Sequence, residues 1–448
     1  MYIINEGEYT VKKFKSVLMI FIVLIANILN TLTFSTVYGE EPTSEEVQTE
    51  YSPHAKYILM EDLTSGAVLF EQNADTTFAP GNLVKIVTAI TVLENCSDLS
   101  KTVTVENGLL DGFDYNNNYH IGLKYGETLS VHDLLAAMLV HDATDCAIVL
   151  GHSILDSHDD FVTQMNTIAV NAGALNTTFT DTSGLDTINA KTTLRDMKCI
   201  TQYALQIETF AKLVSTEKIE IPPTNKYSEP RILFNINQFI STYYSTAHFN
   251  GNIKGVKTYF NNEDDCGNIS YYKNATNEIL ILCAKSDSDE TNIYSYNDIE
   301  YLIDYVHTNF TTVTLIEKEQ FLSEVKINNS SSSERLLLAS DSKLTYKMPV
   351  DYDKSKIEQI IITNNNIEAP IKKGEPLGKV EVYYDGRKCG EVNLIAYTSV
   401  ESSIFSYIKY IFFVIVDSIY FKIIILIFIA IFIIRTININ RHKRKRNK

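Results

Sequence analysis

The stretch "FAPGNLVKIVTAITVLE", Phe78–Glu94, indicates how this 448-residue chain folds. A proline and a glycine precede an apolar run whose pattern predicts a helix beginning near Asn82. Asn82 and Lys85 are three residues apart, so both lie on one face of that helix. An unpaired lysine would be costly in the core, and a polar partner is therefore expected.

The segments around this helix predict a mixed domain. Alternating apolar residues on both sides of a Thr-Ser-Gly turn, over residues 55–75, indicate a β-hairpin. Residues 129–154 read as two helices with a break between them, and Ser130 with Asp133 resembles a helix-start box. A further amphipathic helix, antiparallel strands and a last helix follow at 192–205, 253–286 and 299–310. Helices packed on an antiparallel sheet, an α+β fold, are expected.

The pattern changes at about Thr312. Short strands separated by polar turns continue to about Thr398, and "YYDGRK" at 383–388 is typical of a hairpin. We therefore predict a body domain over 41–310 and a small all-β domain over 311–399.

The two ends of the chain predict export and membrane attachment. Residues 1–40 combine lysines, an apolar stretch and small residues, as in a signal peptide cleaved near Gly39 or an uncleaved signal anchor. Residues 405–435 are apolar enough to span a bilayer, although Asp417 and Lys422 interrupt them. The basic tail at 436–448 then lies in the cytoplasm, and the body lies outside it.

The composition excludes several classes of function. The net charge is −16, and the basic residues concentrated in the tail leave the body more acidic still, which argues against a nucleic-acid partner. The six cysteines form no C-x-x-C pair, and His120, His141 and His152 show no metal-ligand spacing. Neither a metal nor another cofactor is expected.

Taken in order, these segments resemble the low-molecular-weight penicillin-binding proteins, which are serine-type D-alanyl-D-alanine carboxypeptidases. The resemblance covers nearly the whole chain, from the export signal through "YILMEDLTSGAVLFEQNAD", "PGNLVK", "TDTSGLD" and "GVKT" to "APIKKGEPLGKVEVYYDGRKCGEVNLIA" and the anchor. It implies a β-lactamase/transpeptidase-like domain, a small β-domain and action on peptidoglycan stem peptides.

The resemblance also implies three catalytic elements. The family has S-x-x-K at a helix start, where serine attacks the penultimate D-Ala carbonyl and lysine takes the proton. An S-x-N turn relays protons and binds the substrate amide, and K-T-G on an edge strand holds the substrate carboxylate. The corresponding positions here are Asn82 and Lys85, then Asp142 and Thr144, and finally Lys257, Thr258 and Tyr259.

Each element departs from the family pattern. Asn82 replaces the nucleophile, Asp142 and Thr144 replace serine and asparagine, and Tyr259 replaces glycine. An amide nitrogen is delocalised and is no nucleophile, so acyl transfer is expected to be lost. The literal matches "SDSK" at 340–343 and "SYN" at 295–297 lie outside the expected helix start and turn, and we interpret them as chance.

The surviving residues have two interpretations each. Lys85 is either a relic paired with an acid such as Asp142 or a retained ligand-binding cation. Lys257 and Thr258 could still hold a terminal carboxylate, or Lys257 could be an exposed edge lysine. Tyr259 either closes the site or offers a stacking face. The turn "TSGLD", 182–186, is expected to be structural.

The sequence thus predicts a membrane-anchored wall protein of the carboxypeptidase family that has lost catalysis. Its expected role is to bind peptidoglycan or to act as a scaffold, with stem peptides or wall-synthesis proteins as partners. Two alternatives stay open: an enzyme that still hydrolyses D-Ala-D-Ala, and a purely structural protein that acts through its β-domain.

Overall fold

A computed structural model describes residues 51–446 except 187, 263–264, 289–292 and 332–334. The predicted signal segment, 1–40, lies outside the described residues. The first domain contains a five-stranded antiparallel sheet in the order β2-β1-β9-β8-β7. Its strands are β1 (Tyr57–Asp62), β2 (Val68–Gln72), β7 (Ile253–Asn262), β8 (Asp265–Lys273) and β9 (Glu278–Ser286). The predicted hairpin over 55–75 is confirmed by the pairing of β1 with β2.

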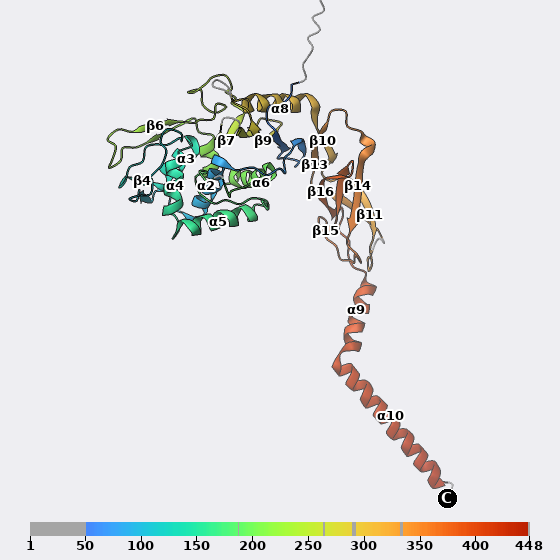
Figure 1. Cartoon of the computed structure of the whole chain (residues 1–448). Helices are drawn as coiled ribbons and strands as arrows, with labels where there is room; N and C mark the ends of the chain where they lie inside the picture. The colour runs from blue at the N-terminus through green and yellow to red at the C-terminus, as the bar shows by residue number, and fades with distance from the viewer. Residues whose placement is uncertain (1–50, 187, 263–264, 289–292, 332–334, 447–448) are drawn as a thin grey trace, which may run out of the picture. The chain divides into compact units, whose positions relative to one another are not determined.

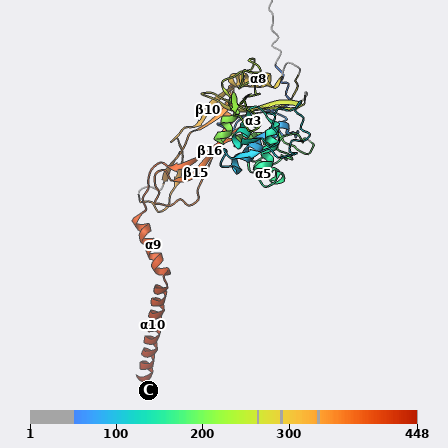
Figure 2. The same ribbon diagram turned by 90° about the vertical axis from the view of Figure 1, so that its left-hand side faces the viewer.

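Helices cover both faces of this sheet (Figures 1 and 2). Leu59 of β1 belongs to one apolar core, which it shares with the helices from α2 to α7. Its neighbours Ile58 and Met60 belong to a second core, against α8. This division follows from the alternation of side chains along a strand. The helices are η1 (Gly81–Leu83), α2 (Val84–Asn95), α3 (Val131–Val140), α4 (Thr144–Ser153), α5 (His158–Asn171), α6 (Leu194–Leu205), α7 (Glu208–Val214) and α8 (Ser295–Asn309).

Local sequence signals account for several of these helix boundaries. The Ser130 hydroxyl accepts a hydrogen bond from the Asp133 amide at 3.0 Å, which confirms the predicted start of α3. Thr193 caps α6 in the same way through the Asp196 amide, also at 3.0 Å. Two short strand pairs complete this part of the chain: β3 (Thr102–Thr104) with β4 (Thr128–Ser130), and β5 (Lys218–Ile221) with β6 (Arg231–Phe234).

The chain continues from α8 into an all-β domain. Strands β10 (Phe310–Ile316) and β13 (Leu344–Pro349) form one sheet. The other has the order β11-β12-β16-β15-β14. Its strands are β11 (Phe321–Lys326), β12 (Arg335–Ser340), β14 (Ile357–Thr363), β15 (Pro376–Tyr384) and β16 (Arg387–Ala396). Asp385 and Gly386 join β15 to β16 with φ values of 50° and 77°, the left-handed pair that a tight two-residue hairpin requires.

The apolar C-terminal segment differs from the single continuous span that the sequence predicts. It forms α9 (Ile404–Asp417) and α10 (Ile419–Arg446), and the Ser418 hydroxyl at the break accepts a hydrogen bond from the Tyr420 amide. Asp417 and Lys422 form an ion pair across the break at 2.6 Å. Among the described residues no single helix is long and apolar enough to cross a membrane. The helix pair Ile411–Asp417 and Lys422–Ile437, which is bent by 60°, together has the length and apolar composition of a membrane span.

Candidate functional site

The first turn of α2 is positioned by a second turn packed against it. Gly184 has a φ of +89°, and a Cβ there would lie 2.1 Å from the Gly81 carbonyl oxygen. The two backbones therefore meet where only glycine fits. Thr182, in the same turn, accepts a hydrogen bond from the Thr88 hydroxyl of α2 at 2.8 Å through its carbonyl oxygen. The "TSGLD" turn thus holds the helix start that carries Asn82 and Lys85.

Lys85 is buried and fully engaged by the break between α3 and α4. Its ammonium lies 2.8 Å from Asp142 Oδ1, 2.7 Å from the Asp142 carbonyl oxygen and 2.8 Å from Thr144 Oγ1. Only 1% of the Lys85 surface is exposed. The prediction that Lys85 pairs with Asp142 is confirmed.

Asp142 joins all three elements of the predicted site. Its φ of +59° is in the left-handed region, which aspartate tolerates better than most residues. One carboxylate oxygen accepts from Lys85 and from Lys257 of β7, and the other accepts from Asn82 Nδ2 at 2.9 Å. The sequence suggested Asp142 as a partner for Lys85 but did not identify it as a partner for Lys257.

The side-chain nitrogen of Asn82 is directed inward. It donates to Asp142 Oδ2 and to the Thr258 carbonyl oxygen, each at 2.9 Å. The residue is 8% exposed. Where the family resemblance places an attacking hydroxyl, this chain therefore has an amide donor that ties α2 to β7 and to the α3–α4 turn.

The cluster contains two cations and one anion, all buried. Burial by itself raises the pKa of Asp142, but the fields of Lys257 and Lys85 and their hydrogen bonds outweigh it and lower the pKa. Burial lowers the pKa of Lys257 to about 8, against the attraction of Asp142. The nearby charge of Lys85 adds to this lowering of the Lys257 pKa, because one carboxylate is shared between two ammonium groups.

Strand β7 divides the other predicted residues between its two faces. Lys257 reaches Asp142 and is 3% exposed, so it is not an exposed edge lysine although β7 is an edge strand. The Thr258 hydroxyl shares a hydrogen bond of 2.9 Å with the hydroxyl of Tyr296, on α8. Thr258 therefore directs its side chain toward the second core and away from the ion cluster. The sequence gave no signal for this partnership with Tyr296.

Tyr259 fills the position of the family's glycine. Its ring makes an edge-to-face contact with Phe78 at 5.9 Å between centroids, and its hydroxyl donates to the Ala79 carbonyl oxygen at 3.0 Å. The residue is fully buried, and this burial raises the pKa of its phenol. Tyr259 therefore packs beneath the start of α2 and offers no exposed stacking face.

Asp145 is a buried acid that sequence reasoning did not include in the site. Its carboxylate accepts hydrogen bonds from the amides of Ile121, Leu123 and Cys146 at distances between 2.9 and 3.3 Å. The Thr144 amide in turn donates to the Tyr119 carbonyl oxygen at 2.8 Å. An acid in the first turn of a helix was the available signal, since such residues often hold backbone amides. Asp145 thus fixes the loop before β4 against the start of α4.

The residues interpreted as chance matches lie elsewhere. Ser340 is in the β-domain, where its hydroxyl donates to the Glu317 carbonyl oxygen at 2.6 Å, and Lys343 is half exposed near Glu317. Ser295 begins α8. No group of three or more His, Cys, Asp or Glu residues suited to a metal ion occurs in the part of the chain that the structure describes.

Comparison with known proteins agrees with this architecture. A family model described as D-alanyl-D-alanine carboxypeptidase matches residues 43–267, and one for the penicillin-binding protein 5 C-terminal domain matches 310–402. The fold resembles penicillin-binding protein 5 from Haemophilus influenzae, with a TM-score of 0.61 and 22% identity over 79% of this chain and 99% of that one. A peptidoglycan synthesis regulatory factor, PBP3, from Streptococcus pneumoniae has a TM-score of 0.64 and 16% identity. The match covers 78% of this chain and 100% of that one. These proteins define the structural class, a penicillin-binding-protein fold with a C-terminal β-domain.

Curated relatives cover most of the chain as well. The D-alanyl-D-alanine carboxypeptidase DacF of Bacillus subtilis (strain 168) is 25% identical over 352 residues, which are 76% of this chain and 85% of the relative. The D-alanyl-D-alanine carboxypeptidase DacC of Escherichia coli (strain K12) is 26% identical over 384 residues, which are 82% of this chain and 88% of the relative. The chain belongs to the D-alanyl-D-alanine carboxypeptidase family.

Proposed function

We propose that this chain is a non-catalytic member of its family that acts as a membrane-anchored, wall-associated binding or scaffolding protein. The observation that carries the proposal is the Asn82 amide, which donates to Asp142 and Thr258 where acyl transfer needs an attacking oxygen. Loss of a serine nucleophile alone reduces turnover by about six orders of magnitude in serine proteases.

The general base of the family mechanism is also compromised. A lysine that takes a proton from a nucleophile must present a neutral amine with a free lone pair. Lys85 instead donates hydrogen bonds to Asp142 Oδ1 and Thr144 Oγ1, each at 2.8 Å, so its nitrogen is engaged within the protein. The missing nucleophile at Asn82 and the engaged amine of Lys85 therefore both support loss of the attack on the substrate carbonyl.

The residues that would hold a substrate carboxylate are engaged within the protein. Lys257 pairs with Asp142, and Thr258 bonds to Tyr296. Binding a stem peptide here would require breaking a buried ion cluster, which is costly. We therefore place the wall-binding surface outside this cluster, and we expect no measurable calorimetric heat with a D-Ala-D-Ala peptide at about millimolar concentration.

The proposed location is the outer face of a cell membrane. An export-type segment at residues 1–40, the bent apolar helix pair and the basic tail at 436–448 support it. The body would then lie outside the membrane and the tail in the cytoplasm.

Three measurements test this proposal together. Purified full-length protein should release no D-alanine from a D-Ala-D-Ala stem peptide, and isolated wall sacculi should sediment it. Release of D-alanine above an Asn82→Ala, Lys85→Met control would support the active-enzyme alternative and contradict the proposal. Absence from the wall pellet would contradict the binding role. A chain that ends at residue 402 should be absent from the membrane fraction. Its presence there would contradict the proposal that the C-terminal segment is the membrane anchor.

A further inference from the structure

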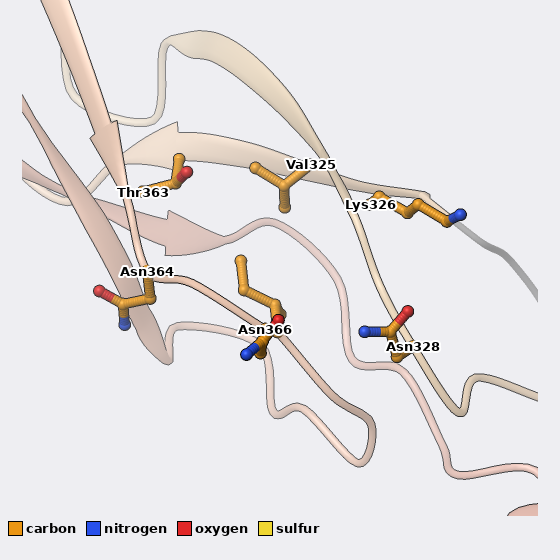
Figure 3. Close-up of a pocket in the computed structure, with 7 residues that line it drawn as sticks. Val325, Lys326, Asn328, Thr363, Asn364 and Asn366 are labelled. Atoms are coloured by element: carbon orange, nitrogen blue, oxygen red, sulfur yellow. The ribbon is translucent and has the colours of Figure 1, made fainter.

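The β-domain contains a polar pocket that no part of the family's chemistry uses. It lies between the end of β11 and the end of β14 and has a volume of about 290 Å³. Figure 3 shows Val325 and Thr363 facing one another across it, with Asn366 and Asn328 along the lower rim in that view. The residues that line it are Val325, Lys326, Asn328, Thr363, Asn364, Asn366 and Ile367.

Backbone hydrogen bonds hold the frame of this pocket. The Asn328 amide donates to the Ile367 carbonyl oxygen at 2.9 Å, and the Ala369 amide donates to the Asn328 carbonyl oxygen at 3.0 Å. The Asn364 amide donates to the Leu377 carbonyl oxygen at 2.8 Å. Ile367 is buried in the core of the domain. The walls are therefore held in place without the use of the asparagine side chains.

Those side chains remain available to a ligand. Within the described residues, the side-chain carboxamide groups of Asn328, Asn364 and Asn366 make no hydrogen bond, and Lys326 makes no ion pair. Each amide offers two N–H donors and one carbonyl acceptor, and the lysine offers a cation. Val325 and Ile367 add small apolar surfaces between them. A matching ligand has many neutral donors and acceptors, small methyl groups and a negative charge.

A second cavity extends the first along β11. It has a volume of about 370 Å³ and is lined by Glu324, Val325, Lys326 and Arg335, so the two cavities share Val325 and Lys326. A surface with two adjoining depressions suits an elongated ligand better than a single small molecule.

We propose that this surface, hereafter the β11–β14 groove, binds an N-acetylated glycan strand of the peptidoglycan type, in which muramic acid units without a stem peptide carry a lactyl carboxylate. The asparagine amides would pair with sugar hydroxyl and acetamido groups, Val325 and Ile367 would contact acetyl methyls, and Lys326 would pair with a carboxylate. The inference rests on the proposed wall-binding function and specifies its site.

An added peptide strand is the competing occupant. β14 is an edge strand in the described sheet, and Ile360 and Ile362 are exposed on it. Such a peptide would use the β14 backbone and these isoleucines, and it would leave the amides and Lys326 without a role. The unused polar groups favour the glycan.

The test uses full-length protein in detergent micelles and calorimetry with soluble sugars. Tetra-N-acetylchitotetraose should bind, and cellotetraose, which lacks acetamido groups, should give no heat. The double variant Asn328→Ala, Asn366→Ala should weaken binding at least about tenfold. Asn365→Ala is the matched control, because Asn365 is exposed in the same loop but does not line the pocket, and it should bind as the wild type does. Lys326→Met should weaken binding only of a disaccharide that contains muramic acid.

Other outcomes overturn the inference. The inference is contradicted if neither N-acetylated sugar gives heat, or if cellotetraose binds as tightly as tetra-N-acetylchitotetraose. It is also contradicted if the double variant binds the N-acetylated sugars as tightly as the wild type does. Binding to walls that survives in the double variant but is lost on Ile360→Lys, Ile362→Lys would assign the surface to a peptide strand. If wall sacculi sediment wild type and double variant equally, the wall-binding function stands and only the groove is wrong. If sacculi sediment neither, both proposals fail.

Discussion

Asn82 and Asp142, sixty residues apart in the chain, are joined by a buried hydrogen bond of 2.9 Å. The same carboxylate accepts from Lys85 at 2.8 Å and from Lys257, so three segments of the chain meet at one acid. The family's catalytic positions are thus connected to one another within this protein. In this buried cluster a single carboxylate faces two ammonium groups, and it also accepts a hydrogen bond from Asn82.

Restoring the serine should not restore activity. In Asn82→Ser, Lys85 remains paired with Asp142, and Tyr259 still packs against Ala79. We expect D-alanine release within about tenfold of the parent protein, far below the roughly million-fold effect of a working nucleophile. A single-turnover assay with a D-Ala-D-Ala peptide measures this. Recovery of hydrolysis by this one change would show that the rest of the site is intact.

Removing the charge of Asp142 should destabilise the protein strongly. Asp142→Asn keeps the shape and tolerates the left-handed φ, but it leaves two buried ammonium groups without a counter-ion. We expect the free energy of unfolding to fall by about 3–5 kcal/mol. Urea denaturation measures it, with Asp159→Asn as a matched control because Asp159 is fully exposed and pairs only weakly with His158 at 4.0 Å. If Asp142→Asn and Asp159→Asn unfold at the same urea concentration, the account is contradicted.

Stability should depend on pH through Lys257. Its pKa is about 8 in the folded protein and about 10.5 when unperturbed, so between these values the unfolded chain binds more protons than the folded chain. The free energy of unfolding therefore rises with pH in this window. The free energy of unfolding of the wild type should rise by about 3 kcal/mol more over this window than that of Lys257→Met, because each unit of pKa difference corresponds to about 1.4 kcal/mol. Urea titrations from pH 7.5 to about 10.5 measure the difference, and a constant difference would exclude Lys257 as its source.

The contact between Gly184 and Gly81 should tolerate no side chain. A Cβ at Gly184 meets the Gly81 carbonyl oxygen at 2.1 Å, whereas one at Gly66, with a similar φ of +70°, meets nothing within 4 Å. Gly66→Ala should therefore cost only the backbone strain, about 1 kcal/mol. Gly184→Ala should cost clearly more, because the two turns must separate. Thermal melts of both variants compare them, and similar losses would contradict a close contact between the turns.

The sequence predicted much of the fold because its signals are local. Hairpin turns, the capping serine at Ser130 and the periodicity of α2 each depend on neighbouring residues. The pairing of Lys85 with Asp142 was also predictable, since a buried lysine needs an acid and the resemblance placed the two segments together.

Other features depend on contacts between distant segments. The Thr258 side chain contacts Tyr296 because the face of β7 that carries Thr258 packs on α8. The nest of amides around Asp145 forms only when the loop before β4 folds over α4. The division of the C-terminal apolar run into α9 and α10 occurs at Ser418, which composition alone did not single out.

Intact-mass analysis after incubation with excess penicillin tests the central claim most directly. The account predicts no mass increase for this chain under conditions in which an active carboxypeptidase of the family becomes fully acylated. A stoichiometric adduct of one penicillin, absent from an Asn82→Ala, Lys85→Met variant, would show that the site still forms an acyl-enzyme and would contradict the account.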